Sequence, residues 1–82
     1  MVRNVIDQAT RWLEKGRILE RDNIFGEAFK CFEQGLALSP EHPELLCALA
    51  GLYHMGYGVA ENEERAVALL RKAAEQGHAA AS

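Results

Sequence analysis

Apolar residues recur at helical spacing in four segments of this 82-residue chain. The four stripes cover residues 6–19, 25–36, 46–53 and 66–73, and each places its apolar side chains on one face of a helix. Either Trp12 or Leu13 fills the middle of the first stripe. The sequence shows neither the sustained alternation nor the Asn-Gly hairpin that indicates β-strands. The pattern therefore predicts an all-α protein with four helices.

The residues between the stripes predict where the helices begin and end. Asn4 and Asn62 are suitable N-terminal caps for the first and fourth helices. Pro43 suits the first position of the third helix, since the N–H that proline lacks would have no partner there. Ser39 precedes a proline, which disfavours the α region and ends the second helix. Gly77 lies where a C-terminal cap would end the fourth helix.

The two halves of the chain repeat one pattern of small and large residues. A shift of 34 residues superimposes the first and third stripes, and a shift of 38 residues superimposes the second and fourth. The four additional residues lie in the glycine-rich turn between the third and fourth stripes. Small residues recur where we expect the paired helices to cross, Gly16 with Ala28 and Ala50 with Ala66. The chain is thus predicted to form two helix–turn–helix units.

At these residues the chain resembles two related families of helical repeats. Residues 9–42 resemble a tetratricopeptide repeat through Trp12-x3-Gly16-x2-Leu19, Ala28-x3-Phe32-x2-Gly35 and Pro40. Residues 43–79 resemble the longer Sel-one-like repeat through Leu49-Ala50-x2-Tyr53-x2-Gly56-x-Gly58-Val59, Arg65-Ala66 and Lys72-Ala73-Ala74-Glu75-Gln76-Gly77. The resemblance implies a single domain over residues 1–82, an α-α superhelix (solenoid) that binds other proteins and performs no catalysis.

Gly35 departs from the tetratricopeptide pattern, which usually has alanine at this position. A glycine inside a helix weakens that helix by about 0.5–1 kcal/mol relative to alanine. We therefore expect the second helix to be weaker than the pattern of the family would make it.

Composition and charge exclude several classes of function. The net charge of −3 argues against nucleic acid as a partner, because such proteins present a basic patch. No apolar run reaches the roughly 18 residues of a membrane span, and the N-terminal residues lack the apolar core of a secretory signal. Two cysteines are too few for a disulfide framework and indicate free thiols in a reducing compartment. These features predict a cytoplasmic protein.

The resemblance also implies where a partner binds, because in such repeats the first helix of each pair lines the concave face. The positions that this assigns to the groove are Leu13, Arg17, Arg21, Cys47, Gly51 and His54. We expect them to hold an extended peptide or a helix with acidic residues. Tyr57, between two glycines, is a further expected contact. The alternative is that Arg17 and Arg21 only pair with Glu14 and Glu20 on a solvated surface.

Candidates for enzyme chemistry or a metal site are weak. Cys47 and His54 share one helix face but are separated by about 10 Å along it, whereas a nucleophile and its base need contact at roughly 3 Å. Adding Glu44 gives a row of three groups that cannot converge on one zinc ion. The Gly56–Gly58 turn lacks the lysine and the strand of a phosphate-binding loop. We therefore predict no enzyme activity, no metal and no cofactor.

The large apolar residues predict both a core and an uncovered surface. Trp12, Phe25, Phe29 and Phe32 are expected in the core. Val67 and Leu69 are expected on the outer side of the last helix, where nothing covers them. Since about three repeats are usually needed for stability, we expect a homodimer or a longer repeat array. The leading function is a scaffold or adaptor, and the alternative is a small dedicated chaperone for a secreted or assembly-prone partner.

Overall fold

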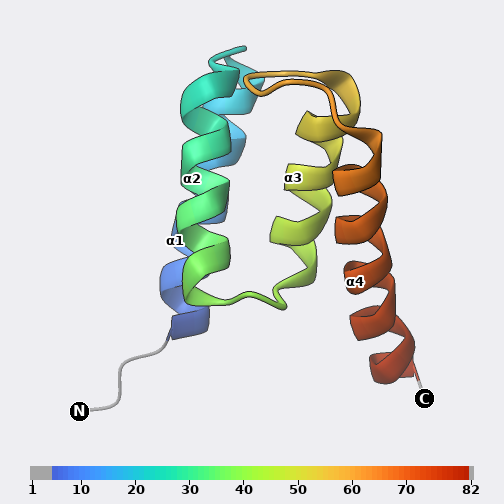
Figure 1. The fold of residues 1–82 in the computed structure, drawn as a ribbon. Coiled ribbons are helices and arrows are strands. Elements are labelled where there is room, and N and C mark those ends of the chain that lie inside the picture. Colours follow the sequence, from blue (N-terminus) through green and yellow to red (C-terminus); the bar gives the residue numbers. More distant parts are fainter. Residues whose placement is uncertain (1–4, 82) are drawn as a thin grey trace.

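The chain folds into four α-helices in a computed structural model, which describes the backbone of residues 5–81 and the side chains of residues 5–76. The helices are α1 (Val5–Arg21), α2 (Phe25–Leu38), α3 (Pro43–Met55) and α4 (Glu63–Ala81), and residues 5–81 contain no strand. The hairpin of α1 and α2 packs against the hairpin of α3 and α4 through α2 and α3 (Figure 1). The predicted all-α solenoid of two helical hairpins is confirmed.

The predicted turn residues shape most of the helix ends. Pro43 occupies the first turn of α3, and Gly56 ends that helix in the left-handed conformation with φ of 71°. The Asn62 side-chain oxygen accepts a hydrogen bond of 3.1 Å from the Arg65 backbone N–H, which caps α4 as expected. The cap predicted at Asn4 lies outside the described residues.

The prediction that Gly77 ends the last helix is wrong, because α4 continues to Ala81. Three alanines follow in the sequence, and alanine has the highest helix propensity of all residues. One glycine costs a helix only about 1 kcal/mol relative to alanine. The backbone therefore continues through it. None of the helices in residues 5–81 has the length and apolar character that crossing a membrane requires.

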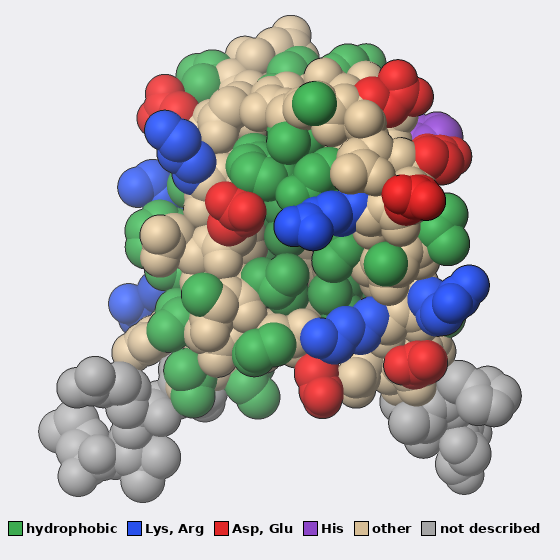
Figure 2. Space-filling view, viewed as in Figure 1, with side chains coloured by type: hydrophobic (Ala, Val, Ile, Leu, Met, Phe, Trp, Pro, Cys, Tyr) green, Lys and Arg blue, Asp and Glu red, His purple; other side chains and the backbone are tan. Residues whose placement is uncertain are grey.

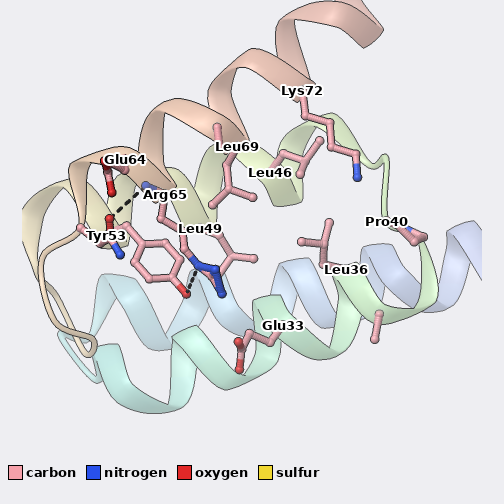
Figure 3. A pocket seen from close by; sticks show the side chains of 13 residues that line it. Glu33, Leu36, Pro40, Leu46, Leu49, Tyr53, Glu64, Arg65, Leu69 and Lys72 are labelled. Carbon is pink, nitrogen blue, oxygen red and sulfur yellow. Dashed lines mark hydrogen bonds between the residues drawn. The ribbon is translucent and has the colours of Figure 1, made fainter.

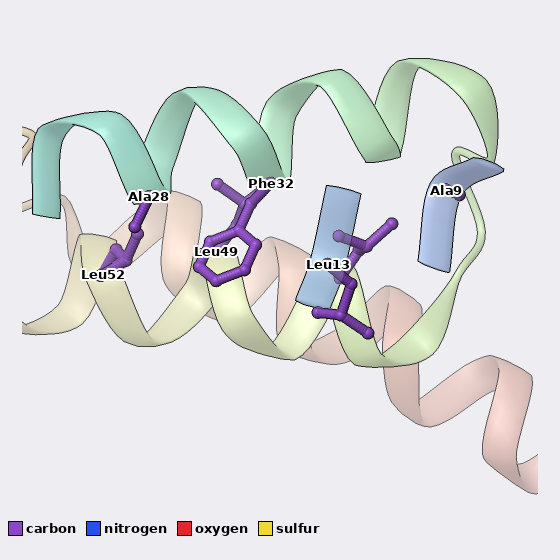
Figure 4. Close-up of a cluster of buried hydrophobic side chains, with 7 residues drawn as sticks. Ala9, Leu13, Ala28, Phe32, Leu49 and Leu52 are labelled. Carbon is purple, nitrogen blue, oxygen red and sulfur yellow. The ribbon is translucent and has the colours of Figure 1, made fainter. Parts of the chain in front are cut away.

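The core lies where α1, α2 and α3 meet (Figure 4). Phe32 and Leu45 are completely buried, and Leu13 is only 3% exposed. Trp12 is half-buried, with the Lys15 ammonium 5.5 Å from the centre of its ring, so the prediction that Trp12 lies in the core is wrong. The buried positions of α1 are Ala9, Leu13 and Gly16, whose spacing of four and three residues puts Trp12 at the edge of the buried face.

Two helical glycines are required by close packing. A Cβ atom on Gly16 would lie 2.4 Å from Cε1 of Phe32. A Cβ atom on Gly35 would lie 2.9 Å from Cδ1 of Leu45 and 3.1 Å from the carbonyl oxygen of Ala9. The expectation that Gly35 only weakens α2 is therefore incomplete, because alanine at this position would press on α1 and α3.

The loop between α3 and α4 reaches back to the first hairpin (Figure 1). Tyr57 stacks on Phe25, with ring centres 4.4 Å apart. Gly58 has φ of +75°, and a Cβ atom at this position would lie 2.5 Å from the carbonyl carbon and oxygen of Phe25. The glycine-rich loop therefore packs against the first turn of α2.

Candidate functional site

A groove of about 770 Å³ opens between α2 and α4, with α3 at its base (Figure 3). Its apolar floor consists of Leu36 from α2, Leu46 and Leu49 from α3, and Leu69 from α4. The space-filling view shows hydrophobic side chains in the hollow of this face, with basic side chains across it (Figure 2). The groove exists because α3 packs against both α2 and α4 and holds them on either side of it.

Charged side chains surround the apolar floor. Arg65, Lys72 and the carboxylate of Glu64 line the groove from α4, and Glu33 lines it from α2. Arg65 Nε lies 3.4 Å from the Tyr53 hydroxyl oxygen, to which it donates a hydrogen bond, and its guanidinium carbon is 5.6 Å from the centre of the Tyr53 ring. Tyr53 in turn meets Phe29 edge to face, with ring centres 5.5 Å apart. Arg65, at the basic edge of the groove, is thus positioned by Tyr53, which itself packs on Phe29 and joins α3 to α2.

The site residues predicted on the first helix of each pair do not form the expected groove. Leu13, expected on its floor, belongs to the buried core and is not accessible to a partner. Arg17 is exposed, and its Nη2 donates to Glu44 Oε2 at 3.4 Å. This ion pair joins α1 to α3, instead of pairing Arg17 with Glu14 or Glu20. Arg21, at the end of α1, and Cys47 and Gly51, on α3, are exposed.

His54 and Tyr57, the two remaining predicted site residues, already have partners. His54 Nδ1 lies 2.7 Å from Glu63 Oε1, which links the end of α3 to the start of α4. Tyr57 is 40% exposed while it stacks on Phe25. Since Glu44 pairs with Arg17 and His54 with Glu63, Glu44, Cys47 and His54 are not joined into one site. The described residues contain no group of three side chains able to hold a metal ion.

The pairing with Glu63 changes the titration of His54. The hydrogen bond to Glu63 and the charge of that carboxylate raise the pKa of His54 above its ordinary value of 6.5. The pairing therefore stabilises the fold fully below pH 6.5, and its contribution is lost as the pH rises through the raised pKa of the folded state. Because the side chains of His54 and Glu63 are both exposed, we expect only a small effect on stability.

We expect an NMR titration of the His54 ring to give a midpoint above 6.5 in the native chain. The variant Glu63→Gln removes the charge and should return the midpoint to the ordinary value. Glu75→Gln, which neutralises a carboxylate in a later turn of α4, is the matched control and should leave the midpoint unchanged. An equal midpoint in the native chain and in Glu63→Gln would contradict the pairing.

The sequence reasoning missed the groove because it misplaced two leucines of α4. Leu70 was expected in the packed stripe but is 48% exposed, whereas Leu69 was expected on the outer side but lines the groove and packs against the core. The buried side of α4 is centred on Ala66 and Ala73, and the two leucines lie on opposite sides of that line. That Leu69 of α4 and Leu36 of α2 line one groove depends on how the two hairpins pack.

One protein-family model, that of the Sel1 repeat, matches residues 1–17, 9–39 and 43–78. No curated protein and no solved structure matches the chain. Sel1 repeats are helical hairpins of the tetratricopeptide-like superfamily, they generally mediate protein–protein interaction, and they are typically non-catalytic. The groove, the two stacked hairpins and matches that extend over nearly all of the sequence agree: the chain belongs to the Sel1 repeat family.

Proposed function

We propose that this chain is a scaffold or adaptor that binds a segment of a partner protein in the groove between α2 and α4. The observation that carries the proposal is the hollow between α2 and α4, where the half-buried Leu36 and Leu69 face the opening and cations lie along one edge. The buried Leu46 and Leu49 form the base of this hollow. Apolar clefts with a few polar groups at fixed places are the usual form of a binding site. We take residues 1–82 as one domain with repeat units at 9–42 and 43–79.

The charges around the floor indicate the chemistry of the segment that binds. Two cations, Arg65 and Lys72, and one carboxylate, Glu64, lie on the α4 side, so that this side has a net positive charge, whereas Glu33 lies on the α2 side. A guanidinium has five N–H donors, and Tyr53 accepts a hydrogen bond from one of those on Arg65. The partner segment is therefore amphipathic, with apolar side chains on the floor and carboxylates facing α4.

The α1–α3 face is the second candidate surface, through Arg17, Arg21, Cys47, Gly51 and His54, with Tyr57 of the α3–α4 loop as a further candidate contact. The exposure of these residues supports it. However, Glu44 and Glu63 already pair with two of its charged groups, and the apolar residue expected on its floor is buried. A partner would have to displace those carboxylates for little apolar contact. We therefore favour the groove between α2 and α4.

Two labelled peptides would test the proposal by fluorescence anisotropy. Both are designed amphipathic helices with the same apolar face, and the polar face of one is acidic whereas that of the other is basic. We expect the acidic peptide to bind about tenfold more tightly, because contacts with two exposed cations contribute up to ~1 kcal/mol each. The variant Lys72→Glu should remove this preference, and Leu69→Glu should abolish binding of both peptides.

Arg17→Glu is the matched control for these variants, because it reverses one exposed charge on the α1–α3 face. We expect it to leave both affinities unchanged. If Arg17→Glu abolished binding while Lys72→Glu and Leu69→Glu did not, the partner would bind on the α1–α3 face. If neither peptide bound at high micromolar concentration, an apolar acidic segment would not be the ligand.

A dedicated chaperone for a secreted or assembly-prone helix is the second candidate function. The observation that favours it is the predominantly apolar floor, which would shield such a helix from water. Co-expression separates the two functions, because a chaperone is solubilised only by its cognate partner whereas an adaptor is soluble alone. For either function we place the chain in the cytoplasm, and the free Cys31 and Cys47 support such a reducing compartment.

A further inference from the structure

The outer surface of α4 carries an apolar strip that no described residue covers. The strip consists of Val67, Leu70 and Ala74, which are three and four residues apart and so lie on one face of the helix. Val67 is 46% exposed and Leu70 is 48% exposed. This outer strip faces away from the groove, since Arg65, Leu69 and Lys72 line the groove from the other side of α4.

The first hairpin shows what covers the equivalent surface. The shift of 38 residues places Phe29, Phe32 and Leu36 of α2 on Val67, Leu70 and Ala74 of α4. The strip on α2 is covered in large part: Phe29 packs on Tyr53 of α3, and Phe32 is completely buried. Leu36 packs against the core on one side and lines the groove on the other. The outer strip of α4 is thus a surface of the kind on which this fold packs another helix.

The charges beside the outer strip complement a second copy of the same helix. A shallow hollow of about 380 Å³ is lined by Glu63, Glu64, Val67, Ala68 and Arg71. Glu64 and Arg71 are seven residues apart, which is about two turns or 10 Å along the helix. If two copies of α4 pair antiparallel about a two-fold axis near Val67, each Glu64 meets the Arg71 of the other copy.

We propose that the chain forms a symmetric homodimer in which the outer strips of two α4 helices pair antiparallel. A head-to-tail arrangement is less favourable. In that arrangement α1 of the next copy would cover α4 as α3 covers α2, and the shift of 34 residues replaces Leu45 and Leu49 by Arg11 and Lys15. The interface contains one helix from each copy, so it lies at the small end of protein interfaces and the dimer is weak.

Sedimentation equilibrium of the full chain from ~10 to ~500 µM tests the proposal. Its apolar strip does not line the groove, although Glu64 lines both surfaces. We expect a reversible monomer–dimer equilibrium that Leu70→Lys weakens at least tenfold. Ile18→Lys is the matched control, because Ile18 is equally exposed at 51% but lies on α1. It should leave the equilibrium unchanged. Far-UV circular dichroism of each variant shows whether the helices are retained.

A charge-swap pair tests the antiparallel arrangement. Arg71→Glu and Glu64→Arg should each weaken self-association, because each brings like charges together across the two-fold axis. An equimolar mixture of the two variants should associate more tightly than either variant alone, since opposite charges then meet at both ends. A strictly monomeric native chain would overturn the proposal, as would association that is insensitive to Leu70→Lys, lost in Ile18→Lys, or no stronger in the mixture.

Discussion

Gly58→Ala is expected to destabilise the chain by about 2–4 kcal/mol. The left-handed conformation of Gly58 costs an L-residue roughly 1–2 kcal/mol. Its added Cβ atom would also lie 2.5 Å from the backbone of Phe25, which has no rotamer that would relieve the overlap. The loop must then lift away from α2 and lose the stacking of Tyr57 on Phe25. A domain of this size is stable by roughly 4–12 kcal/mol, so the loss is a large fraction of the total.

Urea denaturation followed by far-UV circular dichroism measures this loss. Gly56→Ala is the matched control, because Gly56 has nearly the same positive φ, 71°, but its nearest neighbour is Cβ of Glu61 at 3.3 Å, a contact that a shift of a few tenths of an ångström relieves. It should cost little more than the conformational part, about 1–2 kcal/mol. Equal losses in the two variants would mean that the contact between the loop and α2 contributes nothing.

Gly16→Ala is expected to destabilise the chain by about 2 kcal/mol, although alanine is the better helix former. Propensity alone would give a gain of about 1 kcal/mol in a helix interior. Against this, the added Cβ atom would lie 2.4 Å from the ring of Phe32, which is completely buried and enclosed by the core. Overpacking of this kind costs up to about 3 kcal/mol, so steric overlap outweighs propensity.

Gly51→Ala separates the two effects, because a Cβ atom on Gly51 of α3 meets nothing within 4 Å. It should stabilise the chain by about 0.5–1 kcal/mol, and the two alanine variants should therefore shift the urea midpoint in opposite directions. Adding Phe32→Leu to Gly16→Ala should recover part of the loss, since the smaller side chain makes room. A stabilising Gly16→Ala would show that α1 and α2 can separate without cost.

The fold follows from local signals in the sequence, and the internal repeat adds the order of packing. Helical spacing gives four stripes, and Pro43, Gly56 and Asn62 give helix ends that the structure retains. Gly77 was misread because a glycine ends a helix only where the following residues favour another conformation, and alanines follow it. Trp12 was misread because Trp12 and Leu13 both lie about one turn from Gly16, and helical spacing alone does not decide which of the two is buried.

The groove between α2 and α4 could not be predicted in the same way, because it is a property of three helices together. Leu46 and Leu49 belong to a stripe that one partner helix would cover completely. Whether a hollow remains above these buried side chains depends on how far apart α3 holds its two neighbours. Similarly, Arg17 has acidic residues within one turn on its own helix, yet it pairs with Glu44 of α3. Periodicity describes one helix, and the distance between helices requires coordinates.

The packing of the Gly56–Asn62 loop on α2 has a consequence for how the two repeats come apart. In an ordinary repeat array each unit adds its own stability and a term for the surface it shares with its neighbour, so an end unit can fray alone. Here the second hairpin contacts the first in two places: α3 packs against α2, and the loop that connects α3 and α4 packs against Phe25. Separating the two hairpins must also break the contacts of this loop with Phe25. We therefore expect the two hairpins to unfold together as a single cooperative unit.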